Sequence, residues 1–127
     1  MDTRDFDGRD KKTVMSISFR EKNNVLIADL VGEVRLTEDF TPSLRNLISE
    51  HIAGGKINFL LNFAKVDFVD SYGIGDIVAA YLDVQGKSGK LKMTNLSPKI
   101  RLIFNYSGLT RVLEIFDNEE KALASFA

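Results

Sequence analysis

The stretch LLNFAKVDFVDSYGIGDIVAAYL, residues 60–82, decides the fold expected of this chain. It belongs to a run that starts at Ile57 and is apolar at nearly every position, as is typical of a central strand covered on both faces. After a short connection, helical spacing predicts a helix that starts at Ser71 and buries Ile74, Ile77, Val78, Tyr81 and Leu82. The stretch therefore predicts a buried strand over residues 57–63 followed by a helix.

The segments before this stretch predict a β-hairpin and a helix. Residues 15–19 alternate between apolar and polar, and a polar turn joins them to a second apolar run over residues 25–31. Gly32 is expected to close that second strand. Thr37 is the expected N-cap of the first helix, because its hydroxyl can accept a hydrogen bond from an early backbone N–H, and Gly54 is expected to end this helix.

The segments after the stretch continue the alternation of strands and helices. Residues 91–93 predict a strand, and Ser97 is the expected N-cap of a third helix that leaves through a left-handed turn at Gly108. Residues 112–116 predict a last strand, and Asn118 is the expected N-cap of a final helix. Alternation after a hairpin favours right-handed crossovers, so we expect an α/β domain with a mixed, largely parallel sheet and about four helices.

Composition indicates one ordinary globular domain. The chain has 127 residues and a formal net charge of −1, which gives no field suited to nucleic acid or to an anionic membrane. Residues 1–12 are mostly charged, so we expect a flexible tail there, followed by a single domain over residues 13–127. With no cysteine, no secretory signal and no apolar run long enough for a bilayer, we expect a cytoplasmic protein.

Ser71 is the residue whose position suggests a function. The carboxyl ends of parallel strands and the starts of the following helices are where α/β folds build their sites. A phosphate on Ser71 would face helix N–H groups and the positive end of the helix dipole, and its added charge can break an apolar or acidic interface. The alternative is that Ser71 is simply the N-cap of its helix.

The segment VDFVDSYGIG, residues 66–75, resembles the signature of the STAS domain family of bacterial anti-sigma factor antagonists. Two further segments support the resemblance: GEVRL at 32–36 is similar to the entry into the family's first helix, and SGLTRVLEIFDNEEKAL at 107–123 to its closing segment. Together with the order of the elements, the likeness covers about residues 13–126. It implies that Ser71 accepts a phosphoryl group beside Asp70.

The resemblance also implies what the protein does. An anti-sigma factor that is also a serine kinase would bind the unphosphorylated protein and release its sigma factor, phosphorylation would end the binding, and a cognate phosphatase would restore it. The domain itself would catalyse nothing and would need no cofactor or metal. We expect the interface to include Arg35 together with the turn itself, at Asp70, Ser71, Tyr72, Gly73 and Gly75.

Two residues depart from the family pattern. Tyr72 replaces the small residue that often follows the phosphoserine, and it adds bulk and a second hydroxyl at the expected interface. Arg35 stands where many antagonists carry Asp, which reverses a charge near the same surface. The sequence leaves open whether Arg35 pairs with Asp70 or with a phosphate on Ser71.

Two other classes of function remain as alternatives: a constitutive scaffold or adaptor subunit of a regulatory or lipid-transport assembly, and a module that binds a nucleotide or another small ligand. Val78 occupies the third glycine position of a dinucleotide fingerprint, which argues against nucleotide binding. The one histidine, His51, is expected to cap the first helix rather than to serve Ser71 as a base. Asp83 and Lys87 are expected to form an i,i+4 pair on the second helix.

Overall fold

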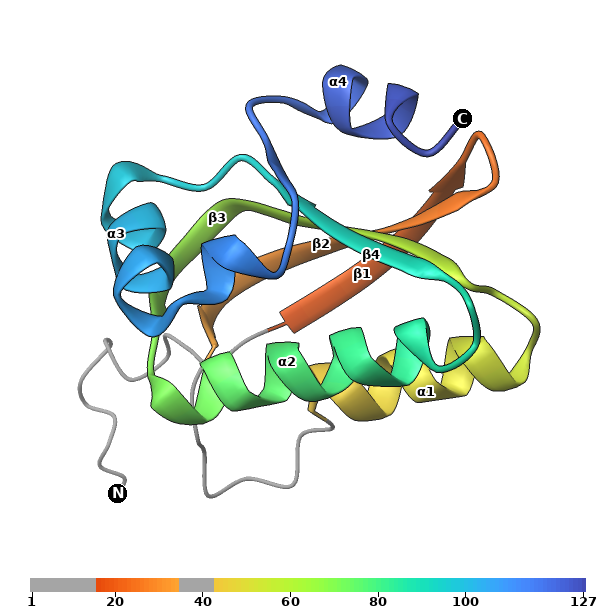
Figure 1. Ribbon diagram of the computed structural model, residues 1–127, viewed down its shortest axis with the longest axis horizontal. Coiled ribbons are helices and arrows are strands. Elements are labelled where there is room, and N and C mark those ends of the chain that lie inside the picture. The colour runs from red at the N-terminus through yellow and green to blue at the C-terminus, as the bar shows by residue number, and fades with distance from the viewer. Residues whose placement is uncertain (1–15, 35–42) are drawn as a thin grey trace, which may run out of the picture.

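The computed structural model describes residues 16–34 and 43–127, which form one α/β domain around a five-stranded sheet (Figure 1). The strand order in the sheet is β1-β2-β3-β4-β5, the same as the order along the chain. The bounds are β1 Ser16–Lys22, β2 Val25–Val34, α1 Leu44–Ala53, β3 Asn58–Val69, α2 Ser71–Gln85, β4 Lys90–Thr94, α3 Pro98–Ser107, a 3-10 turn at Leu109–Arg111, β5 Ile115–Phe116 and α4 Glu119–Ala124.

The sheet is mixed and largely parallel, as predicted. β1 runs antiparallel to β2, while the β2–β3, β3–β4 and β4–β5 pairs are all parallel. Asn23 and Asn24 make the tight turn of the predicted hairpin, both with positive φ, a conformation that asparagine tolerates. Gly32 does not close β2: the strand continues through it to Val34, with a φ of 102° and a shift of register before Glu33.

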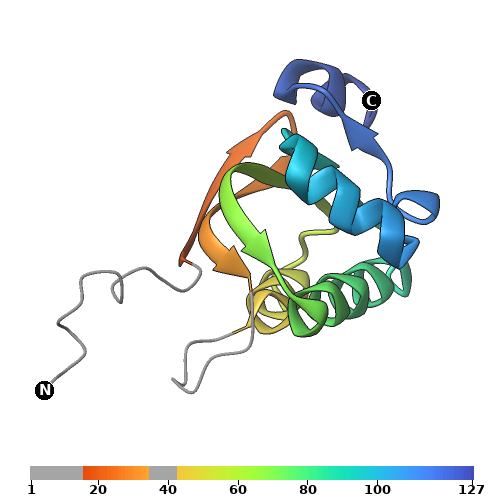
Figure 2. The same cartoon turned by 90° about the vertical axis from the view of Figure 1, so that its left-hand side faces the viewer.

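Helices cover both faces of the sheet, which explains why the central strand is apolar at nearly every position (Figure 2). The larger core joins Phe59 and Leu61 of β3 to buried residues of α1, α2 and α3. On the other face, Leu60 packs in a smaller core with Ala122 and Leu123 of α4. The prediction of a doubly covered central strand is therefore confirmed. β3 is longer than predicted, because it runs without a break to Val69.

Several predicted helix ends are confirmed, because they depend on local chemistry. Ser97 accepts a hydrogen bond from the Ile100 amide, and Gly108 ends α3 in the left-handed conformation with a φ of 79°. Asn118 accepts one from the Lys121 amide at the start of α4. The last strand is shorter than predicted: after the 3-10 turn, the amides of Val112 and Leu113 still donate to the Leu109 carbonyl, and only two residues form β5.

Two predictions about the first two helices are wrong. The N-cap of α1 is Ser43, whose hydroxyl accepts from the Asn46 amide, whereas the predicted cap Thr37 lies outside the described residues. On α2, Leu82 is 57% exposed, while Ala80 and Val84 are fully buried and were not predicted. The helix turns its inner face slightly away from the predicted stripe, because it must face both α1 and β4.

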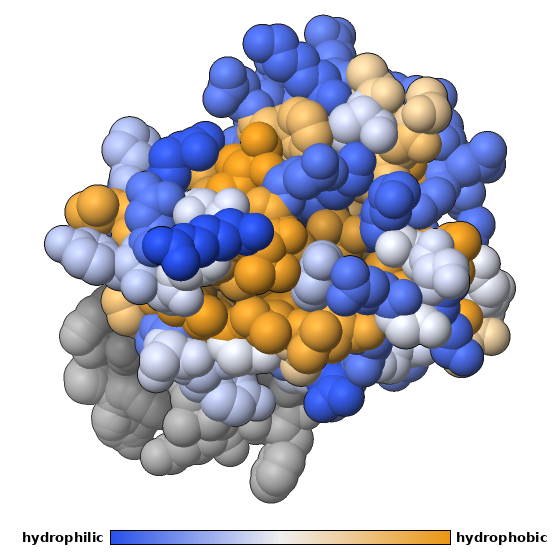
Figure 3. All heavy atoms as spheres, in the orientation of Figure 1, coloured by the Kyte–Doolittle hydropathy of each residue, from blue (hydrophilic) through white to orange (hydrophobic). Residues whose placement is uncertain are grey.

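Apolar side chains also reach the surface. Figure 3 shows them gathered across the middle of the face that α2 borders. The exposed large apolar residues include Leu82 of α2 and Leu102 of α3. Over residues 16–34 and 43–127, no helix has the length and apolar character that a membrane crossing requires.

Candidate functional site

The turn between β3 and α2 is built around Asp70. Its carboxylate Oδ1 accepts a hydrogen bond from the Gly73 amide at 2.7 Å, and its carbonyl accepts from the Ile74 amide at 2.9 Å. Its own amide donates to the Val34 carbonyl at 3.2 Å. Asp70 is therefore the N-cap of α2, and it holds the start of the helix against the end of β2. The alternative that Ser71 is the N-cap is wrong.

Ser71 is the first residue of α2 and is exposed to solvent. Tyr72 follows it and is 48% exposed, so both side chains are accessible to a partner. Because Asp70 caps the helix, the Ser71 hydroxyl is not needed for that task. The structure thus places Ser71 and Tyr72 at the exposed start of α2, next to the cap Asp70.

The two glycines of the turn have different reasons to be glycine. A Cβ on Gly73 would overlap the carbonyl oxygen of Val34 and would lie 2.9 Å from its carbonyl carbon, so only glycine lets α2 approach β2 this closely. Gly75 is exposed, and a Cβ there would meet no atom of the described residues within 4 Å. Gly73 is therefore required for the packing of α2 on β2, whereas Gly75 leaves the surface near Ser71 without a side chain.

Ser71 lies on the wall of a groove between the first turn of α1 and the first half of α2. The groove has a volume of about 570 Å³ and is lined by Ser43, Arg45, Asn46, Ser71, Tyr72, Gly75, Asp76 and Ala79. The sequence predicts three of its α2 residues, Ser71, Tyr72 and Gly75, but not Asp76 or the α1 side. The contribution of α1 had no signal in the sequence, because it depends on how two helices pack.

Asp76 connects the two helices across this groove. Its carboxylate is half-buried and accepts hydrogen bonds from the amide of Leu44 at 2.8 Å and from that of Arg45 at 3.4 Å. Burial raises the pKa of Asp76 above its usual value, and the two amide hydrogen bonds oppose this rise. A side chain of α2 therefore binds the otherwise unpaired N–H groups at the start of α1.

A second link between the helices joins Arg45 to Asp83. The guanidinium donates to both carboxylate oxygens, from Nε at 2.8 Å and from Nη2 at 3.1 Å. This bidentate pair lowers the pKa of Asp83. The Ser49 hydroxyl also donates to Asp83, at 3.4 Å. Asp83 thus faces α1, and the prediction of an intrahelical pair with Lys87 missed this contact.

The remaining candidates lie elsewhere. The His51 ring packs against Phe19, with ring centroids 4.3 Å apart, in the last turn of α1. Arg35 lies outside the described residues, so its pairing with Asp70 or with a phosphate stays a prediction. Among the residues that the structure describes, no three His, Cys, Asp or Glu side chains gather as a metal site would require.

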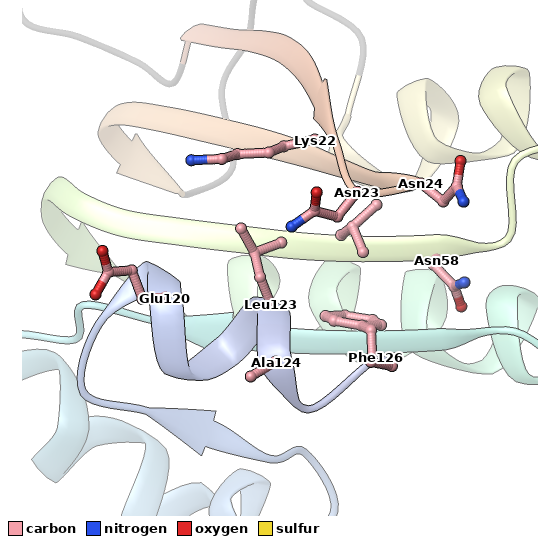
Figure 4. Close-up of a pocket in the computed structure, with 10 residues that line it drawn as sticks. Lys22, Asn23, Asn24, Asn58, Glu120, Leu123, Ala124 and Phe126 are labelled. Atoms are coloured by element: carbon pink, nitrogen blue, oxygen red, sulfur yellow. The ribbon is translucent and has the colours of Figure 1, made fainter.

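A second hollow lies between the β1–β2 turn and α4 (Figure 4). Its volume is about 630 Å³, and its lining includes Asn23 and Asn58 together with Leu123 and Phe126. None of the residues of the Ser71 turn lines it. The groove beside Ser71 is therefore the hollow that contains the residues predicted to function.

Comparison with known proteins shows which proteins this chain is similar to. The anti-sigma F factor antagonist of Paenibacillus polymyxa is 28% identical over 110 residues, which are 86% of this chain and 92% of that protein. A crystal structure of an anti-sigma factor antagonist from Mycobacterium paratuberculosis has a TM-score of 0.76 at 18% identity and covers 89% of this chain and 94% of that one. The Bacillus cell fate determinant SpoIIAA in its phosphorylated form has a TM-score of 0.66 at 24% identity, over 88% of this chain and all of that one.

The family comparison covers most of the domain described above. The model of the STAS domain matches residues 16–122, from the first residue of β1 into α4. The matched range contains the Asp70-Ser71 turn and both helices of the groove. The solved structure from Mycobacterium paratuberculosis has the same fold over 89% of this chain. The chain therefore belongs to the STAS domain family.

Proposed function

We propose that this chain is an anti-sigma factor antagonist that binds an anti-sigma factor kinase while Ser71 is unphosphorylated. The observation that carries the proposal is that two neighbouring residues have different roles at the turn. Asp70 caps α2, and Ser71 presents its side chain to solvent beside the groove. The name of the Paenibacillus relative and the phosphorylated form of the Bacillus protein support the proposal. The protein would work in the cytoplasm and would catalyse nothing itself.

The switch would act through charge at the centre of the interface. The Ser71 oxygen would attack the γ-phosphorus of the kinase's ATP, ADP would leave, and a base of the kinase would take the hydroxyl proton. The phosphate adds a charge of about −1.5 to −2 close to the Asp70 and Asp76 carboxylates. A kinase surface that accommodates a neutral serine there would then meet a concentrated negative charge, and the complex would separate. A phosphatase would restore binding by hydrolysing the phosphate.

Tyr72 and Gly75 are the proposed contact residues beside the switch. A half-exposed tyrosine next to the modified residue is well suited to anchor a partner, because aromatic side chains dominate the energetics of many interfaces. Gly75 leaves room for the partner to approach α2. This assignment gives the partner an apolar anchor next to a charge-sensitive hydroxyl.

A paired capture experiment tests the proposal. The natural protein and its Ser71→Glu variant are used as baits in lysate of the source organism, with Ser88→Glu, in the turn that follows α2, as control. We expect an ATP-binding kinase with the natural and control baits and its loss with Ser71→Glu. If all three baits hold the same partners, a constitutive scaffold becomes the better account.

A further inference from the structure

Arg45 and Ser71 line the same groove from opposite helices. We propose that Arg45 receives the phosphate of phosphorylated Ser71, exchanging its present partner Asp83 for the phosphate. The inference rests on the proposed function only in taking Ser71 as the modified residue. It assigns to α1 a role in the phosphorylated state that the turn alone does not provide.

The position of Arg45 between two anionic groups supports this exchange. The backbone nitrogen of Arg45 is 3.4 Å from Asp76 Oδ1, so the Arg45 backbone lies beside Asp76 of α2. Ser71 precedes Asp76 by about 7.5 Å along the helix axis, and Asp83 follows it by about 10 Å, at about 1.5 Å per residue. A long, unbranched side chain anchored at this level can turn toward either end of α2.

The contact between Arg45 and its present partner Asp83 lies at the surface. The Arg45 side chain is 52% exposed and that of Asp83 is 28% exposed, so water competes with the pair. A phosphate offers three acceptor oxygens and more negative charge than a carboxylate, and the guanidinium fork fits phosphate as well as it fits carboxylate. Phosphorylation therefore shifts the balance toward the Ser71 end.

The charges of the groove give the exchange a further reason. Asp70 and Asp76 are both close to Ser71 in sequence, and Asp76 faces into the same groove. A phosphate placed there without a cation would repel both carboxylates. Among the described residues that line the groove, Arg45 carries the positive charge that can offset this repulsion.

The exchange would transmit phosphorylation from α2 to α1. At present α1 is held to α2 by Asp76 near its start and by Asp83 through Arg45. Moving the Arg45 contact from Asp83 to the phosphate would weaken the second of these links, leaving the Ser49 hydroxyl as the contact of α1 with Asp83. Phosphorylation would then change the surface of α1 as well as the charge of the turn.

The test uses the full chain with phosphoserine installed at position 71 during translation, so it needs no kinase. The second pKa of that phosphate, about 6 in isolation, is measured by phosphorus NMR titration. The variants are Arg45→Gln and Asp83→Asn, and Arg101→Gln is the control, since Arg101 is an arginine of similar exposure on α3. Thermal unfolding confirms that each variant is folded.

We expect Arg45→Gln to raise the phosphate pKa by about half a pH unit, because it removes the neighbouring cation. Asp83→Asn should lower it, because Arg45 is then released from its carboxylate, and Arg101→Gln should leave it unchanged. Equal values in all four proteins, or an equal rise in both arginine variants, would overturn the inference. Such a result would not contradict the proposed kinase switch. Conversely, if the capture experiment finds no switch, the effect of Arg45 on the phosphate pKa can still be measured.

Discussion

The carboxylate of Asp76 on α2 accepts a hydrogen bond from the backbone amide of Leu44, the first residue of α1, at 2.8 Å. At the start of each helix, a carboxylate therefore accepts hydrogen bonds from backbone N–H groups. Asp70 is the N-cap of α2 itself, whereas the carboxylate at the start of α1 comes from Asp76 of α2. This shared arrangement fixes the relative position of the two first turns, and Ser71 lies between the two acids in the sequence.

Removing the Asp76 carboxylate should loosen the start of α1. We expect Asp76→Ala to lower the free energy of unfolding by about 1–3 kcal/mol, because two backbone N–H groups lose their acceptor in a half-buried place. Asp76→Asn should cost less, since its amide oxygen can still accept from Leu44. Chemical denaturation of both variants gives the comparison. If alanine and asparagine are equally harmless, the Leu44 hydrogen bond contributes nothing to stability.

The two glycines of the turn should respond in opposite ways to alanine. Gly73→Ala forces a methyl group into the Val34 carbonyl, so we expect a loss of about 2–4 kcal/mol. Gly75→Ala meets open space among the described residues, and the higher helix propensity of alanine should stabilise the fold by about 0.5–1 kcal/mol. Thermal unfolding measures both. A stable Gly73→Ala variant would contradict the close approach of α2 to β2.

Tyr72 should matter for binding and not for folding. Tyr72→Ala should change stability by less than about 0.5 kcal/mol, because the side chain is half exposed, and it should weaken binding of the captured kinase by about tenfold or more. Tyr106→Ala is the matched control, since Tyr106 is 86% exposed on α3. Titration calorimetry with the captured partner measures the affinities, and equal effects of the two variants would remove Tyr72 from the interface.

The ion pairs of Arg20 should make the free energy of unfolding depend on pH. Arg20 donates to Asp29 of β2 at 2.7 Å and to Glu119 of α4 at 2.6 Å, and these bonds lower the pKa of both carboxyl groups. A lowered folded-state pKa gives stability that is present above the ordinary values, 3.8 for Asp29 and 4.5 for Glu119, and is lost as pH falls through the folded-state pKa.

We therefore expect Arg20→Gln to cost about 1 kcal/mol near neutral pH, a figure that allows for the partial exposure of the pairs, and to cost much less near pH 3. Denaturation of the wild type and the variant at both values gives the difference. Arg101→Gln, whose pair with Asp117 spans 4.0 Å on the surface, serves as control. A cost for Arg20→Gln that does not change with pH would show that packing, and not charge, is responsible.

The features that the sequence predicted correctly depend on nearby residues. The caps at Ser97 and Asn118 form bonds within three residues, and the apolar run of β3 records burial on both faces. The Asp70-Ser71 turn was located for the same reason, because a strand end and a helix start meet there.

The features that the sequence missed depend on packing between distant segments. Asp83 looked like the partner of Lys87 on its own helix, but α1 brings Arg45 to it from 38 positions away. Asp76 offered only a carboxylate within a helix until the start of α1 was placed beside it. The prediction that Leu82 is buried is wrong because two neighbouring elements, α1 and β4, set the orientation of α2.

Phosphoryl transfer to this protein tests the central claim most directly. The kinase captured with the natural protein is purified and incubated with ATP and either the natural chain or Ser71→Ala, and the products are mapped by mass spectrometry. The account predicts one phosphoryl group on Ser71, none on the alanine variant, and loss of the complex once the group is added. Phosphorylation at another residue, or a complex that survives phosphorylation of Ser71, would contradict it.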